Sequence, residues 1–223
     1  MEELDLRNAN KIDPLKRMVE RQTDQEEFSP MDPPDAYAPP AAEDIPFEDL
    51  HPFLKSLMEE HKDFIKELDL FEEVLVRIKE DGMKAEFNKP LGSFFQFLDT
   101  RLVKHNLKEE KLLFPELHRL LLESGQHSKG PEATTAIDML EDDHVKLMQL
   151  SAVTFNFFGL AGRLPNPESR AIVLDAALEQ GKGLVEMLKL HIFREDNVVF
   201  LQAQKEVPKE IFDAMFEKLN LFA

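Results

Sequence analysis

Residues 105–114 read HNLKEEKLLF, and residues 191–200 read HIFREDNVVF. Both stretches have a histidine, a basic residue three positions later, a glutamate four positions later, an acid directly after it, and a final phenylalanine. On an α-helix, positions i and i+4 lie on one face, one turn apart. Each stretch therefore predicts a helix that presents an imidazole and a carboxylate together, and the repetition predicts a duplicated unit.

A shorter repeat precedes each of these stretches. LMEEHK at residues 57–62 resembles MLEDDHVK at residues 139–146, and each contributes one histidine, His61 or His144. The first H-x-x-x-E begins 44 residues after His61, and the second begins 47 residues after His144. Two such hairpins packed face to face would place two equivalent half-sites around a pseudo-twofold axis.

The surrounding sequence shows long segments of helical periodicity separated by Gly and Pro. We expect four helices over residues 52–79, 89–122, 131–160 and 167–205, with a short fifth helix after Pro208. Asn88 is the expected cap of the second helix, and Pro115 should kink or end that helix. Because short connections favour antiparallel neighbours, the sequence predicts an all-α, up-down-up-down four-helix bundle.

Each expected helix carries an apolar stripe that polar side chains interrupt near its middle. Beyond these interruptions, the stripe continues through Leu112 in the second helix and Val198 in the fourth. The interrupting groups are four imidazoles and two carboxylates: His61, His105, Glu109, His144, His191 and Glu195. Burying them together costs much solvation free energy unless a cation compensates. We therefore expect these six residues to be metal ligands.

Composition limits both the metal chemistry and the partners. The chain has no cysteine, so a metal ion must be held by His, Asp and Glu. These donors favour two redox-active ions, and we expect two oxo- or hydroxo-bridged iron ions ahead of manganese or zinc. The net charge of −17 argues against a nucleic-acid partner. Without a bilayer-spanning apolar run or a signal peptide, we expect a cytoplasmic protein with no membrane contact.

The order H, H-x-x-x-E, H, H-x-x-x-E over about residues 47–205 resembles the hemerythrin family, in particular its HHE cation-binding domain. The resemblance implies a hemerythrin-like bundle with a non-haem di-iron centre. It implies that two carboxylates, those of Glu109 and Glu195, bridge the irons. The terminal ligands that it implies are His61, His105, His144 and His191.

Two positions separate this chain from the oxygen carriers of that family. The carriers have a further histidine one turn after the third-helix histidine, where this chain has Met148. They also have an aspartate five residues after the last histidine, a spacing that Asp196 matches here. Asp196 is therefore the rival of Glu195, and we favour Glu195 because it repeats Glu109.

The set of four histidines and two glutamates is more similar to the repair-of-iron-centres proteins and to the iron-sensing F-box hemerythrin domain. The former usually carry an additional cysteine-containing domain, which this cysteine-free chain lacks. The ligand count leaves open positions on each iron, which favours a non-haem di-iron protein that binds O2, NO or peroxide in a redox or stress-response role. The alternatives are a non-enzymatic iron or oxygen sensor or iron-handling protein, and a metal-free helical interaction module.

The first part of the chain differs from the rest in composition. Seven of the 14 prolines lie in the first 50 residues. We expect residues 1–46 to be an N-terminal arm and proline-rich linker, with a short helix over residues 13–25 and a role in contacting a protein partner. Residues 47–223 are then expected to form the bundle with its C-terminal helix.

Several other polar residues are not expected to belong to the site. His51 lies near a helix start, His118 lies off the apolar stripe, and His127 lies in a loop. The acidic run Glu141-Asp142-Asp143 is expected to form a solvated helix face.

Overall fold

The structure is a computed structural model, and it describes residues 45–130 and 132–222. The expected helix over residues 13–25 and the expected partner contact of the N-terminal arm lie outside these described residues. The proposed domain boundary at residue 46 lies close to their beginning.

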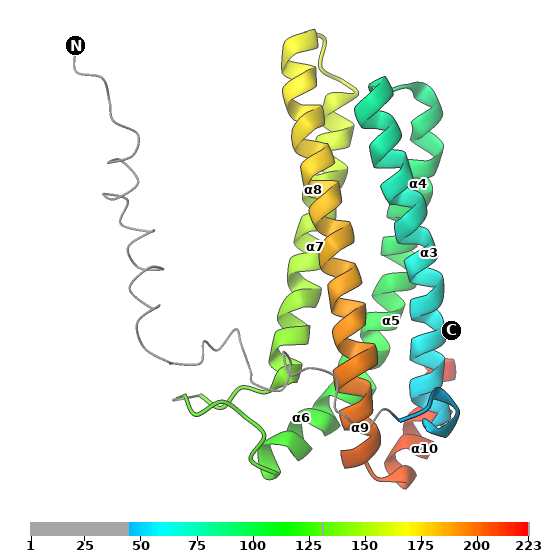
Figure 1. The fold of residues 1–223 in the computed structure, drawn as a ribbon, viewed down its shortest axis with the longest axis vertical. Helices are drawn as coiled ribbons and strands as arrows, with labels where there is room; N and C mark the ends of the chain where they lie inside the picture. Colours follow the sequence, from blue (N-terminus) through cyan, green and yellow to red (C-terminus); the bar gives the residue numbers. More distant parts are fainter. Residues whose placement is uncertain (1–44, 131, 223) are drawn as a thin grey trace, which may run out of the picture.

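The described residues form a bundle of four long helical segments, with no strand among them. Figure 1 shows these segments side by side, with α10 at the lower end of the bundle. The α-helices are α3 (Pro52–Asp81), α4 (Asn88–Phe97), α5 (Val103–Lys108), α6 (Phe114–Glu123), α7 (Ala136–Ala161), α8 (Pro167–Arg194), α9 (Phe200–Glu206) and α10 (Lys209–Lys218). Short 3-10 helices are η1 (Phe47–Asp49), η2 (Ala85–Phe87) and η6 (Leu219–Phe222). The predicted all-α four-helix bundle with a short C-terminal helix is confirmed.

The third segment begins later than expected. We predicted a start at Pro131, a residue that lies outside the described part of the chain, but α7 begins at Ala136. The Thr135 hydroxyl accepts a hydrogen bond from the Ile137 amide at 3.1 Å, and the Asp138 carboxylate accepts one from the Thr135 amide at 2.6 Å. This capping box satisfies amides that have no partner within the helix, and it decides where α7 starts.

The second segment runs from Asn88 to Glu123 with two π-helical insertions, η3 (Leu98–Leu102) and η4 (Glu109–Leu113). The expected capping role of Asn88 is wrong, because Asn88 is itself helical and the 3-10 helix η2 leads directly into α4. Pro115 lies in the first turn of α6, where a missing amide hydrogen costs little. Figure 1 shows α6 turned away from the line of α5, as expected for a bend at Pro115.

The π-helical insertions move the buried face by one residue in both repeats. A π-turn takes up more residues than an α-turn, so the residues after it are rotated about the helix axis. At the end of η4, Leu113 is buried and Leu112 is only half-buried; at the end of η5 (Glu195–Val199), Val199 is buried and Val198 is half-buried. The expectation that Leu112 and Val198 face the core was wrong for this reason.

The apolar core consists of two clusters along the bundle. One cluster, near α6, α9 and α10, includes the fully buried rings Phe53, Phe114, Phe200 and Phe212. The other, toward the α7–α8 connection, includes Phe64, Phe71, Phe94 and Leu184. On every long segment, the predicted His or Glu ligands fall between the residues of these two clusters. The core therefore contains a polar layer near its middle.

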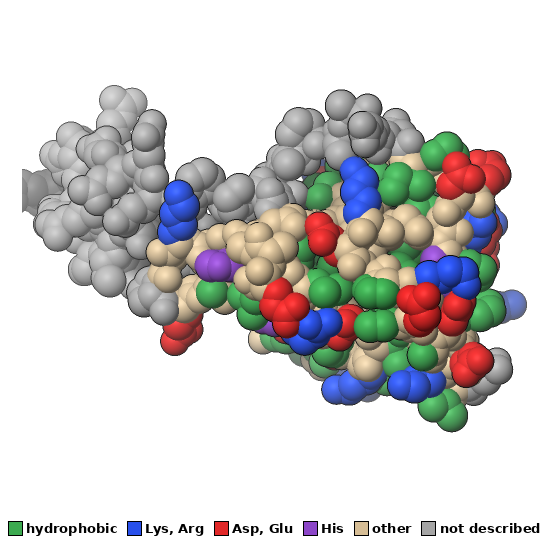
Figure 2. Space-filling view, turned by 90° about the horizontal axis from the view of Figure 1, so that it is seen from below, with side chains coloured by type: hydrophobic (Ala, Val, Ile, Leu, Met, Phe, Trp, Pro, Cys, Tyr) green, Lys and Arg blue, Asp and Glu red, His purple; other side chains and the backbone are tan. Residues whose placement is uncertain are grey.

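The described surface carries charges of both signs. Figure 2, which views the molecule from below, shows acidic and basic side chains interspersed with apolar ones. None of the described helices is both long enough and apolar enough to cross a membrane.

Candidate metal centre

The six predicted ligands converge in the polar layer of the bundle. They form two sets of four, and within each set one ligand atom per residue lies within 4.8 Å of the others. Every one of the six residues is at most 3% exposed. We call the half around His61 and His105 subsite 1, and the half around His144 and His191 subsite 2. Both sets include Glu109 and Glu195.

Each glutamate faces both subsites. Glu109 places Oε1 3.2 Å from Nε2 of His105 and Oε2 3.5 Å from Nε2 of His144. Glu195 places Oε2 3.3 Å from Nε2 of His61 and Oε1 3.1 Å from Nε2 of His191. One oxygen of each carboxylate is therefore directed to each histidine pair, which is the arrangement that bridging two cations requires.

The inward-facing atoms are poorly satisfied by the protein itself. None of the four carboxylate oxygens of Glu109 and Glu195 has a hydrogen-bond partner among the described residues, although all are buried. Within each subsite the two imidazoles bring their Nε2 atoms together, at 2.8 Å in subsite 1 and 3.1 Å in subsite 2. Buried carboxylates without partners are costly, and imidazole and carboxylate are donors that first-row metal ions accept. The residues present therefore fit a pair of metal ions.

The outer ring nitrogen of each imidazole faces a further carboxylate. The Nδ1–carboxylate distances are 2.8 Å for His61–Asp196, 2.8 Å for His105–Glu60, 2.9 Å for His144–Glu110 and 3.7 Å for His191–Asp143. Such outer acids orient an imidazole and keep its proton on Nδ1, which leaves Nε2 available to a metal ion. Three of the four imidazoles thus have an outer acid within hydrogen-bond distance, whereas Asp143 lies farther from the fourth, His191.

Comparison with known protein families identifies the family of this chain. Residues 53–203, more than half of the chain, match the family described as the hemerythrin HHE cation binding domain. The chain belongs to this family. Neither the comparison with curated proteins nor the comparison with solved structures gave a match. The matched residues include both subsites, so this HHE domain is a cation-binding domain with a candidate di-metal site.

The outer acids of the HHE domain follow the same duplication as the inner residues. Glu60 and Asp143 directly precede His61 and His144, whereas Glu110 and Asp196 directly follow Glu109 and Glu195. This outer layer was not predicted above, although an acid stands at matching positions in both repeats. The expectation that Asp143 lies on a solvated face was wrong, because Asp143 is 5% exposed and forms an ion pair with Arg194 at 3.0 Å.

The structure shows where Glu195 and its rival Asp196 lie relative to the two candidate ligand sets. Glu195 belongs to both ligand sets and Asp196 to neither, because the Asp196 carboxylate is directed at the outer nitrogen of His61. Met148, where oxygen carriers have a histidine, is 62% exposed.

The three excluded histidines lie apart from both ligand sets. His51 caps α3 by accepting a hydrogen bond from the Phe53 amide at 3.2 Å. His118 contacts the Thr135 hydroxyl at 2.9 Å, and His127 contacts the Ser128 carbonyl oxygen at 2.8 Å.

Phenylalanine rings enclose the imidazoles of the HHE domain. Phe200 stacks on His61 with ring centroids 5.6 Å apart, and Phe114 stacks on His144 at 5.7 Å. These two rings end the two sequence repeats, and each contacts the histidine of the opposite repeat's shorter segment. Their packing restricts the imidazole planes and keeps water from the centre.

The buried acids draw protons onto the imidazoles. Burial lowers the pKa of His61, but the hydrogen bond to Asp196 and the nearby negative charge of Glu195 outweigh burial and raise this pKa to about 10. Burial also lowers the pKa of His191, but the charge of Glu195 and the interaction with Asp143 raise it to about 9. Burial favours a higher pKa for Glu195, yet the nearby positive charges of His191 and His61 hold this pKa well below its usual value.

These pKa values predict that metal binding releases protons. Below pKa values of about 10 and 9, His61 and His191 hold protons that a metal ion must displace. We expect the apparent metal affinity to rise between about pH 6 and pH 9, by about tenfold per pH unit for each displaced proton. Calorimetry in buffers of different ionisation enthalpy measures the proton release directly. An affinity and a proton count that do not change over this range would contradict the prediction.

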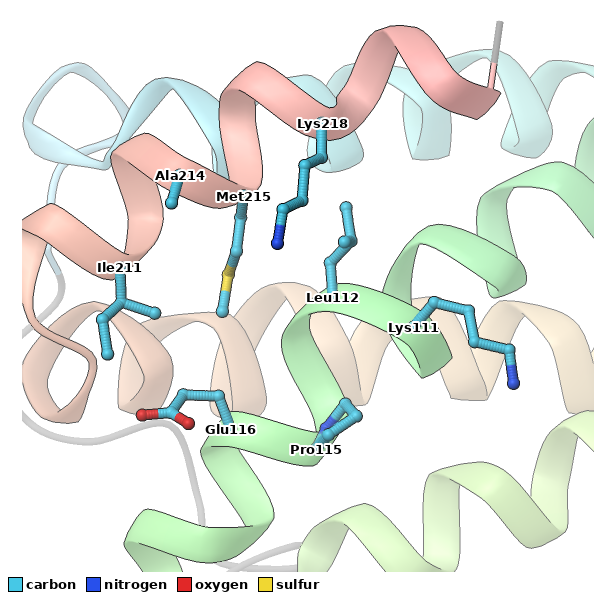
Figure 3. A pocket seen from close by; sticks show the side chains of 8 residues that line it. All are labelled: Lys111, Leu112, Pro115, Glu116, Ile211, Ala214, Met215 and Lys218. Atoms are coloured by element: carbon cyan, nitrogen blue, oxygen red, sulfur yellow. The ribbon is translucent and has the colours of Figure 1, made fainter.

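A surface pocket lies apart from the metal centre. Figure 3 shows this cavity of about 280 Å³ between α10 and the residues around Pro115. Its lining includes Leu112, Glu116, Met215 and Lys218, and none of the six predicted ligands borders it. The pocket is therefore not the candidate metal site.

Proposed function

We propose that this chain holds two iron ions between four imidazoles and two carboxylates, and that the pair binds O2, NO or peroxide in a redox or stress-response role. The ligands in this proposal are His61, His105, Glu109, His144, His191 and Glu195. The observation that carries the proposal is the placement of one oxygen of each glutamate beside each histidine pair. Iron is favoured over manganese or zinc because mixed imidazole and carboxylate donors without thiolate suit a redox-active pair.

The chain's own residues have three tasks in this proposal. Glu60, Glu110 and Asp196 hold the imidazole protons on Nδ1, so that Nε2 remains a free donor toward the centre. Phe114 and Phe200 limit access of water. Glu109 and Glu195 would each offer one carboxylate oxygen to each ion. When bound, the iron pair would supply redox change and open coordination positions for a small ligand.

A hollow beside subsite 1 supports an approach route for that ligand. The hollow has a volume of about 270 Å³ and is lined by Glu60, Phe64, Arg101, Lys104 and Lys108. Two of these residues also contact His105: Glu60 by a hydrogen bond of 2.8 Å, and Phe64 by an edge-on ring contact with centroids 5.0 Å apart. Two side chains thus separate the hollow from the outer side of a predicted ligand.

The proposal predicts about two iron ions per chain after anaerobic reconstitution. Exposure to O2 or peroxide should then produce the near-ultraviolet and visible charge-transfer absorption of a bridged ferric pair. Metal analysis and optical spectra of the same sample measure both properties. The Met148→Ala variant is a suitable control, because this exposed side chain lies outside the centre and its loss should leave both properties unchanged. Fewer than one iron per chain, with no such absorption, would refute the proposal.

A second function, as an iron or oxygen sensor or iron-handling protein, is favoured by the position of the centre. The six polar groups separate the two apolar clusters of the core. Because metal binding stabilises the folded chain, loss of metal would destabilise the packing of both clusters. A metal-free interaction module accounts less well for two matched sets of buried ligand atoms with unsatisfied carboxylate oxygens.

A further inference from the structure

We propose that the two metal subsites are unequal, with subsite 1 (His61 and His105) binding its ion at least about ten times more tightly than subsite 2 (His144 and His191). This inference rests on the proposed di-metal function. It concerns the outer acids Glu60 and Asp143, which act as positioning residues through the imidazoles they face.

In subsite 1 both imidazoles have a close outer acid. The carboxylate of Asp196 is 2.8 Å from Nδ1 of His61, and Oε2 of Glu60 is 2.8 Å from Nδ1 of His105. Glu60 also binds Lys108, but through its other oxygen, Oε1. The glutamate can therefore contact its cation and its histidine at the same time.

Subsite 2 has the same arrangement, but one of its two imidazole–acid hydrogen bonds is missing. His144 keeps its partner, with Nδ1 2.9 Å from Glu110. His191, however, lies 3.7 Å from Oδ2 of Asp143, too far for a hydrogen bond, and its Nδ1 has no hydrogen-bond partner among the described residues. The same oxygen Oδ2 binds the Arg194 guanidinium at 3.0 Å.

The difference follows from the length of one side chain. Asp143 occupies the repeat position of Glu60, and Arg194 occupies that of Lys108. Aspartate has one methylene group fewer than glutamate, and here a single oxygen lies near both the guanidinium and the imidazole. His191 consequently lacks the acceptor that fixes the ring and makes it a better donor. Loss of such an outer partner typically weakens metal binding by about 10–100-fold.

Titration of the metal-free full-length chain with Zn²⁺ tests the inference. Calorimetry should show two binding steps whose affinities differ by about tenfold or more. In NMR spectra, the imidazole signals of His61 and His105 should change in the first step, and those of His144 and His191 in the second. Zn²⁺ is the probe because it is diamagnetic and does not change its oxidation state.

Two reciprocal variants test the cause. Asp143→Glu should lengthen the side chain enough to contact His191 and strengthen the second binding step by about tenfold. Glu60→Asp should weaken the first binding step by about tenfold. Each has a matched control on an exposed neighbour that forms an ion pair with a surface lysine: Asp142→Glu and Glu59→Asp. Neither control should change either step. Glu60 is partly exposed, so its variant remains informative if Asp143→Glu fails to fold.

The outcomes separate this inference from the proposed function. Two ions bound with equal affinity, or His144 and His191 responding first, would overturn the inequality and leave the di-metal proposal standing. Two unequal steps that neither reciprocal variant changes would overturn the assigned cause. Binding of no ion, or of one ion that does not involve both subsites, would overturn the di-metal proposal together with the inference.

Discussion

The Glu195→Gln variant is expected to lose paired metal binding, whereas Asp196→Asn should keep it. Glu195 offers one oxygen to each subsite, so its loss removes a donor from both metal ions at once. Asp196 contacts the outer nitrogen of His61 and belongs to neither candidate ligand set. We expect Glu195→Gln to bind one ion or none, and Asp196→Asn to bind two ions with at most a 10–100-fold loss of affinity.

Both variants remove one negative charge and keep the side-chain size, so each serves as the control for the other. Metal analysis after equilibrium dialysis gives the stoichiometry, and the optical spectrum of the iron-loaded protein reports whether the ions are paired. Circular dichroism checks that both variants retain the helical bundle. A paired spectrum in Glu195→Gln together with its loss in Asp196→Asn would transfer the bridging role to Asp196.

Removal of the metal ions is expected to lower the thermal midpoint by roughly 10–20 °C. An ion present at 100 times its dissociation constant stabilises the folded state by about 2.7 kcal/mol. For a chain of 150–250 residues, 1 kcal/mol corresponds to a change of about 2–4 °C. Two ions acting on the layer between the two apolar clusters should therefore have a large combined effect.

Thermal unfolding before and after chelation, followed by circular dichroism, measures this shift. The Glu195→Gln variant is the control, because a chain that cannot hold the pair should show a much smaller response to the same chelator. An unchanged midpoint after complete removal of iron, with reactivity toward NO or peroxide lost, would refute sensing through stability. It would leave the redox role in place.

The repeats made the helical architecture and the convergence of six polar residues predictable. Each H-x-x-x-E motif places its two side chains on one helix face, and a lone histidine in the partner helix supplies the third group. Because all six interrupt apolar stripes, their burial could be inferred without coordinates. The structure indeed brings all six into two adjoining sets.

Errors arose where local geometry departed from a regular α-helix. The expected inward positions Leu112 and Val198 assumed an uninterrupted helical period, whereas each repeat contains a π-helical segment that starts at the glutamate of its H-x-x-x-E motif. The capping box of Thr135 sets the start of α7 at Ala136. Periodicity alone predicts neither the π-helical segments nor the start of α7, because both depend on a few backbone hydrogen bonds.

The order and spacing of histidines and glutamates by themselves determined that this chain forms a helical bundle with six inward polar groups. That information is local, since it follows from which residues share a helix face. Only the tertiary structure decided which acids support which imidazoles, because each of those contacts joins two different helices. The 2.8 Å contact of Glu60 with His105 and the 3.7 Å separation of Asp143 from His191 depend on side-chain reach across a helix interface. Packing of the four segments sets the distances between these side chains, and the spacing of residues along a single helix does not determine them.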